Sequence, residues 1–230
     1  VNPAELALEV SAQSALGGAL EKYRSGDLLG ALAVTSAEQF TPGARIFRAQ
    51  LELAVGRVNV AESLIAGLNA APANALRELI AVVRGQTVEV APAANSASEL
   101  LAHSYALQSR ADLKAALAAA QQAVQLAPDF GFARARLAEL EFAFGHRRAA
   151  LAELDAALKS SPRLAPAHAL QGFVLLEQNN VVAALAAFDH ARELDAALGS
   201  VWLGRGLVLM QRRDFAGARE SLQVAAALEP

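Results

Sequence analysis

The sequence repeats itself with a period of 34 residues along much of its length. Pro128 and Pro162 are one period apart, and Pro230 follows two periods later, with Ala196 at the position between them. Small residues recur at the same step in three further series: Ala116, Ala150, Ala184 and Ala218; Ala123, Ala157, Ala191 and Ala225; and Ser104, Ala138, Gly172 and Gly206. A fixed period of this length predicts stacked supersecondary units, each of which buries its apolar face against its neighbours.

Each copy divides into two segments that have the features of helices. In the copy at 131–164, residues 132–144 lead to a turn at Gly145, which accepts a positive φ, and residues 147–159 lead to Pro162, which cannot continue a helix. Asp112 and Asp214 stand where second helices begin, as N-cap or first-turn acids should. Hydrophobic residues make up 54% of the chain and aromatic ones only 5%. Alanine, the strongest helix former, fills the difference and favours an all-α fold.

These features resemble the tetratricopeptide repeat (TPR) family, whose unit is a helix–turn–helix of 34 residues. Two copies carry most of the family pattern: Trp202, Gly206, Ala218, Leu222, Ala225 and Pro230 in one, and Leu137, Ala138, Gly145, Ala150, Leu154, Ala157 and Pro162 in the other. Glu141, His168 and Ala196 depart from it, standing where the family has Tyr, Trp and Pro. The resemblance implies an α-solenoid of about six repeats that forms a right-handed superhelix with a concave groove.

The resemblance is clear over residues 97–230, which divide into repeats at 97–130, 131–164, 165–198 and 199–230. For residues 1–96 we expect degenerate TPR-like repeats with an extra helix and a loop. The expected helices there are 15–24 paired with 26–32, 45–56 paired with 58–68, and an unpaired helix at 74–84. Residues 86–96 contain Pro92 and show no helical period, so we expect a loop, or a short extended piece at 87–90, at a subdomain boundary.

The sequence contains no motif that predicts an enzyme, a cofactor site or a metal site. It has no cysteine, which excludes disulfides, zinc–thiolate sites and a cysteine nucleophile. Its four histidines lack metal-binding spacing, and it has no phosphate-binding glycine loop and no nucleophile elbow. A net charge of −3 without a basic cluster argues against nucleic acid as a partner. No apolar run is long enough to insert into a membrane.

The TPR resemblance also implies where a ligand would bind, because family ligands contact fixed positions of each first helix. Carried over to this chain, those positions imply a peptide-binding groove formed by Leu101, Tyr105, Phe132, Glu139, Phe142, Phe173, Leu176, Glu177, Leu203, Leu207 and Met210. Most of these residues are apolar, which suits an apolar peptide or an amphipathic helix. Tyr105 and Phe173 are the strongest candidates for contact. The alternative for each apolar position is burial between neighbouring repeats.

Two functions from different classes follow from these observations. The first is a non-enzymatic protein–protein interaction scaffold. TPR co-chaperones that hold acidic tails use Lys, Asn and Arg where this chain has Tyr105, Glu139 and Phe173, so we exclude that partner class. The alternative is a self-assembling or structural segment of a larger bacterial envelope or secretion protein. It rests on the start at Val1 without a methionine, and on Pro230, after which no polar capping helix covers the last repeat.

Overall fold

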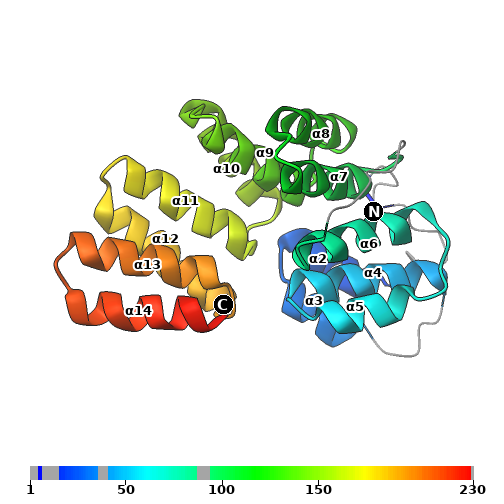
Figure 1. The fold of residues 1–230 in the computed structure, drawn as a ribbon, viewed down its shortest axis with the longest axis horizontal. Helices are drawn as coiled ribbons and strands as arrows, with labels where there is room; N and C mark the ends of the chain where they lie inside the picture. The colour runs from blue at the N-terminus through cyan, green and yellow to red at the C-terminus, as the bar shows by residue number, and fades with distance from the viewer. Residues whose placement is uncertain (1–4, 7–15, 36–40, 87–93, 229–230) are drawn as a thin grey trace.

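The computed structural model describes residues 5–6, 16–35, 41–86 and 94–228, and in these residues all regular secondary structure is helical (Figure 1). Four helix pairs follow the 34-residue period: α7 (Ala97–Ser109) with α8 (Leu113–Leu126), α9 (Gly131–Ala143) with α10 (Arg147–Ser160), α11 (Ala165–Glu177) with α12 (Val181–Leu194), and α13 (Gly199–Gln211) with α14 (Phe215–Leu228). We call α7–α14 the repeat array. The prediction of an all-α solenoid is confirmed.

The turns inside the four pairs share one backbone geometry, although their residues differ. Gly145 adopts a φ of +78°, and Ala111, Asn179 and Arg213, each a whole number of periods away, adopt φ values of +61°, +59° and +63°. Non-glycine residues rarely enter this left-handed region, so the helix pairing must hold them there. The predicted N-caps are confirmed: Asp112 accepts a hydrogen bond from the Ala115 amide at 3.1 Å, and Asp214 accepts one from that of Gly217 at 3.0 Å.

The small residues of the repeat lie where helices come closest together. Ala150 and Ala184 are fully buried. The buried ring of Phe188, on α12, takes up the space that side chains would need at two glycines of first helices. A Cβ at Gly172 would lie 2.7 Å from this ring, and a Cβ at Gly204 would overlap with it. A large residue on one helix is therefore matched by glycine on its neighbours, as dense packing requires.

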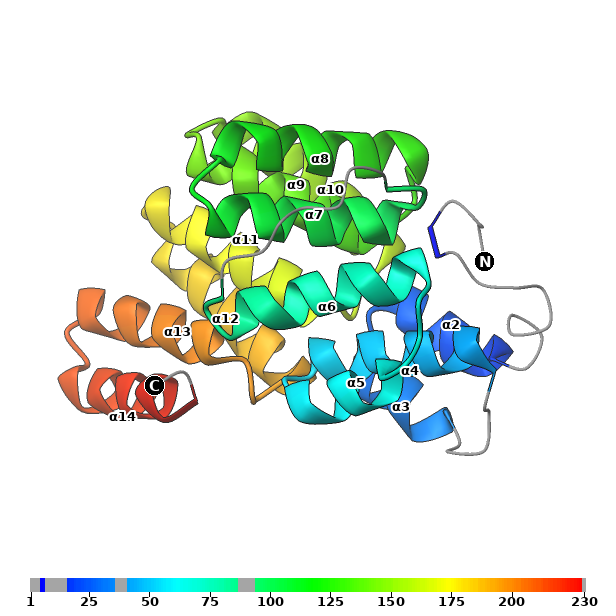
Figure 2. The ribbon, with the colours of Figure 1, turned by 45° about the vertical axis from the view of Figure 1, so that its right-hand side comes forward.

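The residues before the array form five helices in the part of the chain that the structure describes: α2 (Gly17–Ser25), α3 (Leu28–Val34), α4 (Pro42–Ala54), α5 (Val58–Ile65) and α6 (Ala71–Val83). We call α2–α6 the N-terminal region. Figure 2 shows α6 beside α7, where the region meets the start of the array. The expected loop or extended piece at 87–90, Pro92 and the closing Pro230 lie outside the described residues, so the division at residue 96 stays a prediction.

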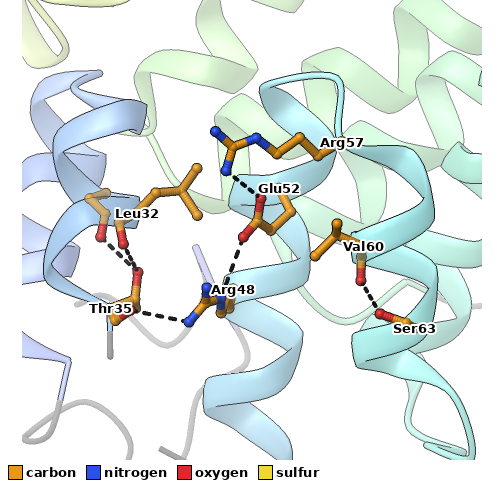
Figure 3. A network of polar contacts seen from close by, with 8 residues as sticks. Leu32, Thr35, Arg48, Glu52, Arg57, Val60 and Ser63 are labelled. Carbon is orange, nitrogen blue, oxygen red and sulfur yellow. Dashed lines mark hydrogen bonds and ion pairs between the residues drawn. The ribbon is translucent and has the colours of Figure 1, made fainter. Parts of the chain in front are cut away.

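A buried carboxylate connects three helices of the N-terminal region (Figure 3). Glu52, on α4, is only 2% exposed, and its oxygens lie 3.4 Å from Nε of Arg48 and 3.2 Å from Nη1 of Arg57. Arg48 in turn donates a hydrogen bond to the carbonyl oxygen of Thr35, which follows α3. A buried carboxylate needs such partners, because burying an isolated charge is costly. The network therefore orients α3 and the start of α5 relative to α4.

Candidate functional site

The N-terminal region contacts the repeat array through two turns that are far apart in the sequence. The amide of Arg163, in the turn between α10 and α11, donates a hydrogen bond to the carbonyl oxygen of Ser25 at 2.7 Å. The hydroxyl of Ser161 donates one to the carbonyl oxygen of Arg24 at 2.5 Å. Gly26, with a φ of +87°, lies so close that an added Cβ would overlap the Leu164 amide nitrogen. We call this contact the junction.

An aromatic cluster beside the junction joins the same two regions. The Tyr23 ring, on α2, stacks on that of Phe132, on α9, with 4.7 Å between the ring centroids and 10° between the planes. Tyr23 also contacts Phe47, on α4, edge to face at 5.5 Å, and Phe130 at 6.4 Å. Burial raises the pKa of the Tyr23 phenol, and the Glu5 carboxylate acts in the same direction. Aromatic pairs of this kind stabilise a contact beyond the area they bury.

A cavity of about 540 Å³ lies between the N-terminal region and the first helices of the array. Its walls are mainly aliphatic and aromatic. The N-terminal region contributes Tyr23, Leu28, Gln50, Leu53, Ala54, Pro72, Ala75, Leu76 and Leu79. The array contributes Ser98, Glu99, Leu101, Ala102, Tyr105, Phe130, Phe132, Ala135, Arg136, Glu139, Leu164, Pro166, Ala169, Leu170, Phe173 and Ser200. A concave, mostly apolar space with a few polar groups has the composition of a ligand site.

One polar corner of the cavity is organised by Arg136, which is 1% exposed. Its guanidinium donates hydrogen bonds to the hydroxyl and carbonyl oxygens of Ser104, to Oε1 of Gln108, and to Oε2 of Glu139 at 2.9 Å. The guanidinium carbon also lies 3.9 Å from the centroid of the Tyr105 ring. The cation is thus paired and hydrogen-bonded, as a buried charge must be.

Tyr105 forms part of the same corner and keeps its proton at neutral pH. Desolvation by the cavity wall raises the pKa of its phenol to about 12 although 36% of the residue is exposed, and the nearby Glu139 carboxylate contributes to the increase. A neutral phenol can both donate and accept a hydrogen bond. Glu139 presents a charged acceptor beside it, with 45% of its side chain exposed. This corner thus offers polar contacts in an otherwise apolar space.

The residues predicted for the groove divide into three sets in the structure. Five line the cavity: Leu101, Tyr105, Phe132, Glu139 and Phe173. Three lie on α13 beyond the cavity, at 43%, 39% and 48% exposure: Leu203, Leu207 and Met210. The remaining three line no part of the cavity: Phe142 and Leu176 pack against buried clusters, and Glu177 pairs with Arg147 at 2.6 Å.

Sequence reasoning missed the part of the cavity wall that comes from the N-terminal region. Tyr23, Leu53 and Leu76 lie in helices that do not follow the 34-residue period, so the repeat assigns them no groove position. It also missed Arg136, for which a signal did exist. The positions one period away from Arg136 are Ala102 and Leu170, so a charged residue there departs from the repeat. Such a departure marks a position with a role of its own.

Two further findings concern the chemistry that the described residues carry. No group of three His, Asp or Glu side chains among them is placed to hold a metal ion. No helix in the described part of the chain is long and apolar enough to cross a membrane.

The fold resembles solved helical-repeat structures that share little of its sequence. A chain of the APC/C hetero-tetramer Cut9–Hcn1 matches with a TM-score of 0.70 and 14% identity, over 86% of this chain and 41% of that one. MamA (41-end) from Desulfovibrio magneticus RS-1 matches with a TM-score of 0.48 and 18% identity, over 84% of this chain and 97% of that one. YrrB, "a TPR protein with an unusual peptide-binding site", matches with a TM-score of 0.46 and 16% identity, over 90% and 94%.

No protein-family model matches the chain, and no curated protein sequence does. Identities this low establish the fold alone. The chain has a TPR-like helical-repeat fold, as its 34-residue period predicted.

Proposed function

We propose that this chain is a non-enzymatic protein-interaction scaffold that binds a peptide or an amphipathic helix on its concave surface. The observation that carries the proposal is a row of exposed apolar side chains on α13, formed by Leu203, Leu207 and Met210. We call it the α13 stripe. Residues at this spacing share one helix face, and the stripe begins one turn after Ser200 in the cavity wall. Exposed apolar patches on a folded surface mark interaction sites.

The surroundings of the α13 stripe suggest the charge of its partner. Arg212 and Arg213 follow the stripe directly, are exposed, and form no ion pair with any described residue. A partner helix with apolar residues on one face and a carboxylate near one end would complement both features. Helix-in-groove recognition uses apolar anchors at this spacing, and charges at the rim set orientation and association rate.

A selection experiment tests this proposal although the partner is unidentified. The chain is used as bait for a displayed library of helical peptides, and the enriched peptides are then measured against two variants. Leu207→Glu places a charge in the stripe, whereas the matched control Val182→Glu places one at a residue of α12 that is 78% exposed. We expect peptides with apolar residues three or four positions apart, and at least tenfold weaker binding only for Leu207→Glu. Equal binding by both variants would contradict the proposal.

A second candidate, self-association through α14, rests on a different observation. Ala225 and Leu222 are partly exposed, whereas their counterparts one period earlier, Ala191 and Phe188, are fully buried against α13. A second copy could cover this face in a head-to-tail contact. Light scattering over a concentration series tests this candidate. A monomer mass at every concentration would contradict it, and a mass that rises with concentration would support it.

A further inference from the structure

We infer that the cavity between the N-terminal region and the repeat array is a binding site for a small, largely apolar molecule that carries one hydrogen-bond donor and no negative charge. None of the α13 stripe residues lines this cavity, so the inference does not depend on the proposed protein partner. It rests on the size of the cavity, on the character of its walls, and on the polar atoms that the described residues leave free.

The volume of the cavity is that of a small-molecule site. At about 540 Å³, the cavity lies within the range of about 300–1,000 Å³ that is typical of small-molecule sites. A cavity of about 150 Å³ already holds one benzene, so this one has room for about three such rings.

The walls offer an apolar molecule contacts from two sides. The N-terminal region presents Leu53, Leu76 and Leu79, and the array presents Phe132 and Phe173. Because the two regions meet at the junction, a molecule inside would contact both of them at once. Burial of apolar surface between such walls is favourable at about 25 cal/mol per Å².

The charged groups of the wall argue against an anionic ligand. Arg136 is the cation among the lining residues, and its hydrogen bonds go to Ser104, Gln108 and Glu139. Few of its N–H groups therefore remain to donate a hydrogen bond to a carboxylate or a phosphate. Glu99 is 2% exposed, and its oxygens accept hydrogen bonds from the Asn95 amide and the Ser96 hydroxyl at the start of α7. The hydrogen bonds of the Arg136 guanidinium and the Glu99 carboxylate are therefore largely made within the protein.

Glu139 is the exception, because one of its oxygens remains free. Oε2 accepts the hydrogen bond from Arg136, and no described residue donates to Oε1. A free carboxylate oxygen beside an apolar cavity favours a ligand that donates a hydrogen bond and repels one that carries a negative charge. An amine, an amide or a hydroxyl on an apolar body would fit both the corner and the walls.

Two fluorescent probes of the same shape test the inference on the complete chain. 1-Aminoanthracene has three fused rings and an uncharged aryl amine, and anthracene-1-carboxylate has the same rings with a negative charge. We expect saturable binding of one 1-aminoanthracene per chain, seen as enhanced fluorescence, and at least tenfold weaker binding of the carboxylate. Glu139→Gln should reduce this difference to less than threefold. A carboxylate that binds the wild type as tightly as the amine does would overturn the inference.

Variants that fill the cavity locate the bound probe. Ala135→Trp adds a large side chain to the array wall, and Ala216→Trp, at an exposed position of α14 outside the cavity, is the matched control. We expect loss of amine binding only in Ala135→Trp. Should circular dichroism show that this variant is unfolded, Ala54→Trp fills the cavity from the opposite wall at an exposed residue. No saturable binding to the wild type, or full binding to a folded cavity-filled variant, would overturn the inference.

Discussion

The repeat array and the N-terminal region are both built from helices, yet different contacts hold those helices in place. In the array, every first helix has 13 residues and every second helix has 14. In the N-terminal region the lengths are 9, 7, 13, 8 and 13 residues. Helices of the array pack against the next copy of the same surface. The short α2 and α3 have no such copy and depend on individual contacts.

Those individual contacts are of two kinds, and they determine where the cavity forms. Inside the N-terminal region, Ile65 and Leu76 belong to a buried cluster formed by α4, α5 and α6. By contrast, Tyr23 and Phe47 share a buried cluster with Phe130, which belongs to the array. Regular stacking thus builds the concave surface, whereas the N-terminal region closes over part of it. A repeat solenoid alone would leave that surface open.

The largest expected effect comes from removing a core side chain of the array. Phe188 is fully buried, and its ring contacts that of Phe173 edge to face at 4.9 Å between centroids. Phe188→Ala should lower the free energy of unfolding by about 3–5 kcal/mol, because the cavity left behind adds to the lost apolar burial. Denaturant unfolding followed by the fluorescence of Trp202, on α13, measures the change. A loss below about 1 kcal/mol would show that α11–α13 pack more loosely than described.

The next effect separates the junction from the rest of the fold. In Gly26→Ala the new Cβ would overlap the Leu164 backbone, and the residue would keep its positive φ. Gly56→Ala is the matched control, because Gly56 has a φ of +80° and nothing within 4 Å of an added Cβ. Both variants have the backbone strain, but only Gly26→Ala overpacks. We expect it to cost about 1–3 kcal/mol more than the control.

Hydrogen exchange measured by mass spectrometry shows which segments of the chain Gly26→Ala destabilises. Gly26→Ala should speed amide exchange in α2, α3 and the turn between α10 and α11, and leave α13 and α14 unchanged. If both glycine variants exchange alike, the junction contributes nothing beyond ordinary turn strain.

A smaller effect distinguishes the two tyrosines, one at the junction and one in the array wall of the cavity. An exposed tyrosine titrates near pH 10. The pKa of Tyr105 is raised to about 12, chiefly by burial, so the folded protein holds this proton where the unfolded chain has lost it. Stability contributed by Tyr105 is therefore complete below about pH 10 and is lost as the pH rises toward 12.

Ultraviolet absorbance of tyrosinate in a Tyr23→Phe variant isolates the titration of Tyr105. We expect a transition about two pH units above that of the unfolded chain. A transition near pH 10 in the folded variant would show that the cavity wall does not desolvate the Tyr105 phenol.

The repeat made the array predictable, because each copy supplies a test of the others. Ala138, Gly145 and Pro162 indicated the first helix of one pair and the ends of both helices, and the same register located Leu101, Tyr105 and Phe173 on the cavity side. The stripe at Leu203 and Leu207 follows from the same rule. Periodicity could not predict how deeply each side chain is buried. Whether Phe142 or Phe132 reaches the cavity depends on the curvature of the stack.

The closure of the cavity was not predictable from the repeat, because it depends on contacts between residues far apart in the sequence. Ser161 and Arg24 are separated by 137 positions, and neither belongs to a motif. In the sequence Gly26 is an ordinary turn glycine, and only the structure shows that the Leu164 backbone lies against it. Every residue has a backbone carbonyl group, so hydrogen bonds to these groups in turns can hardly be predicted from the pattern of side chains. The part of the cavity wall that the N-terminal region contributes could therefore be identified only from the structure.

The N-terminal region closes over the array at the junction, and one backbone amide reports on this contact directly. Arg163 is exposed in its turn, but its amide donates to Ser25. Asp129 holds the same position one period earlier, and its amide donates to no described residue. We predict that the Arg163 amide exchanges with solvent at least tenfold more slowly than the Asp129 amide, measured by NMR and corrected for intrinsic rates. Equal protection factors would contradict the account.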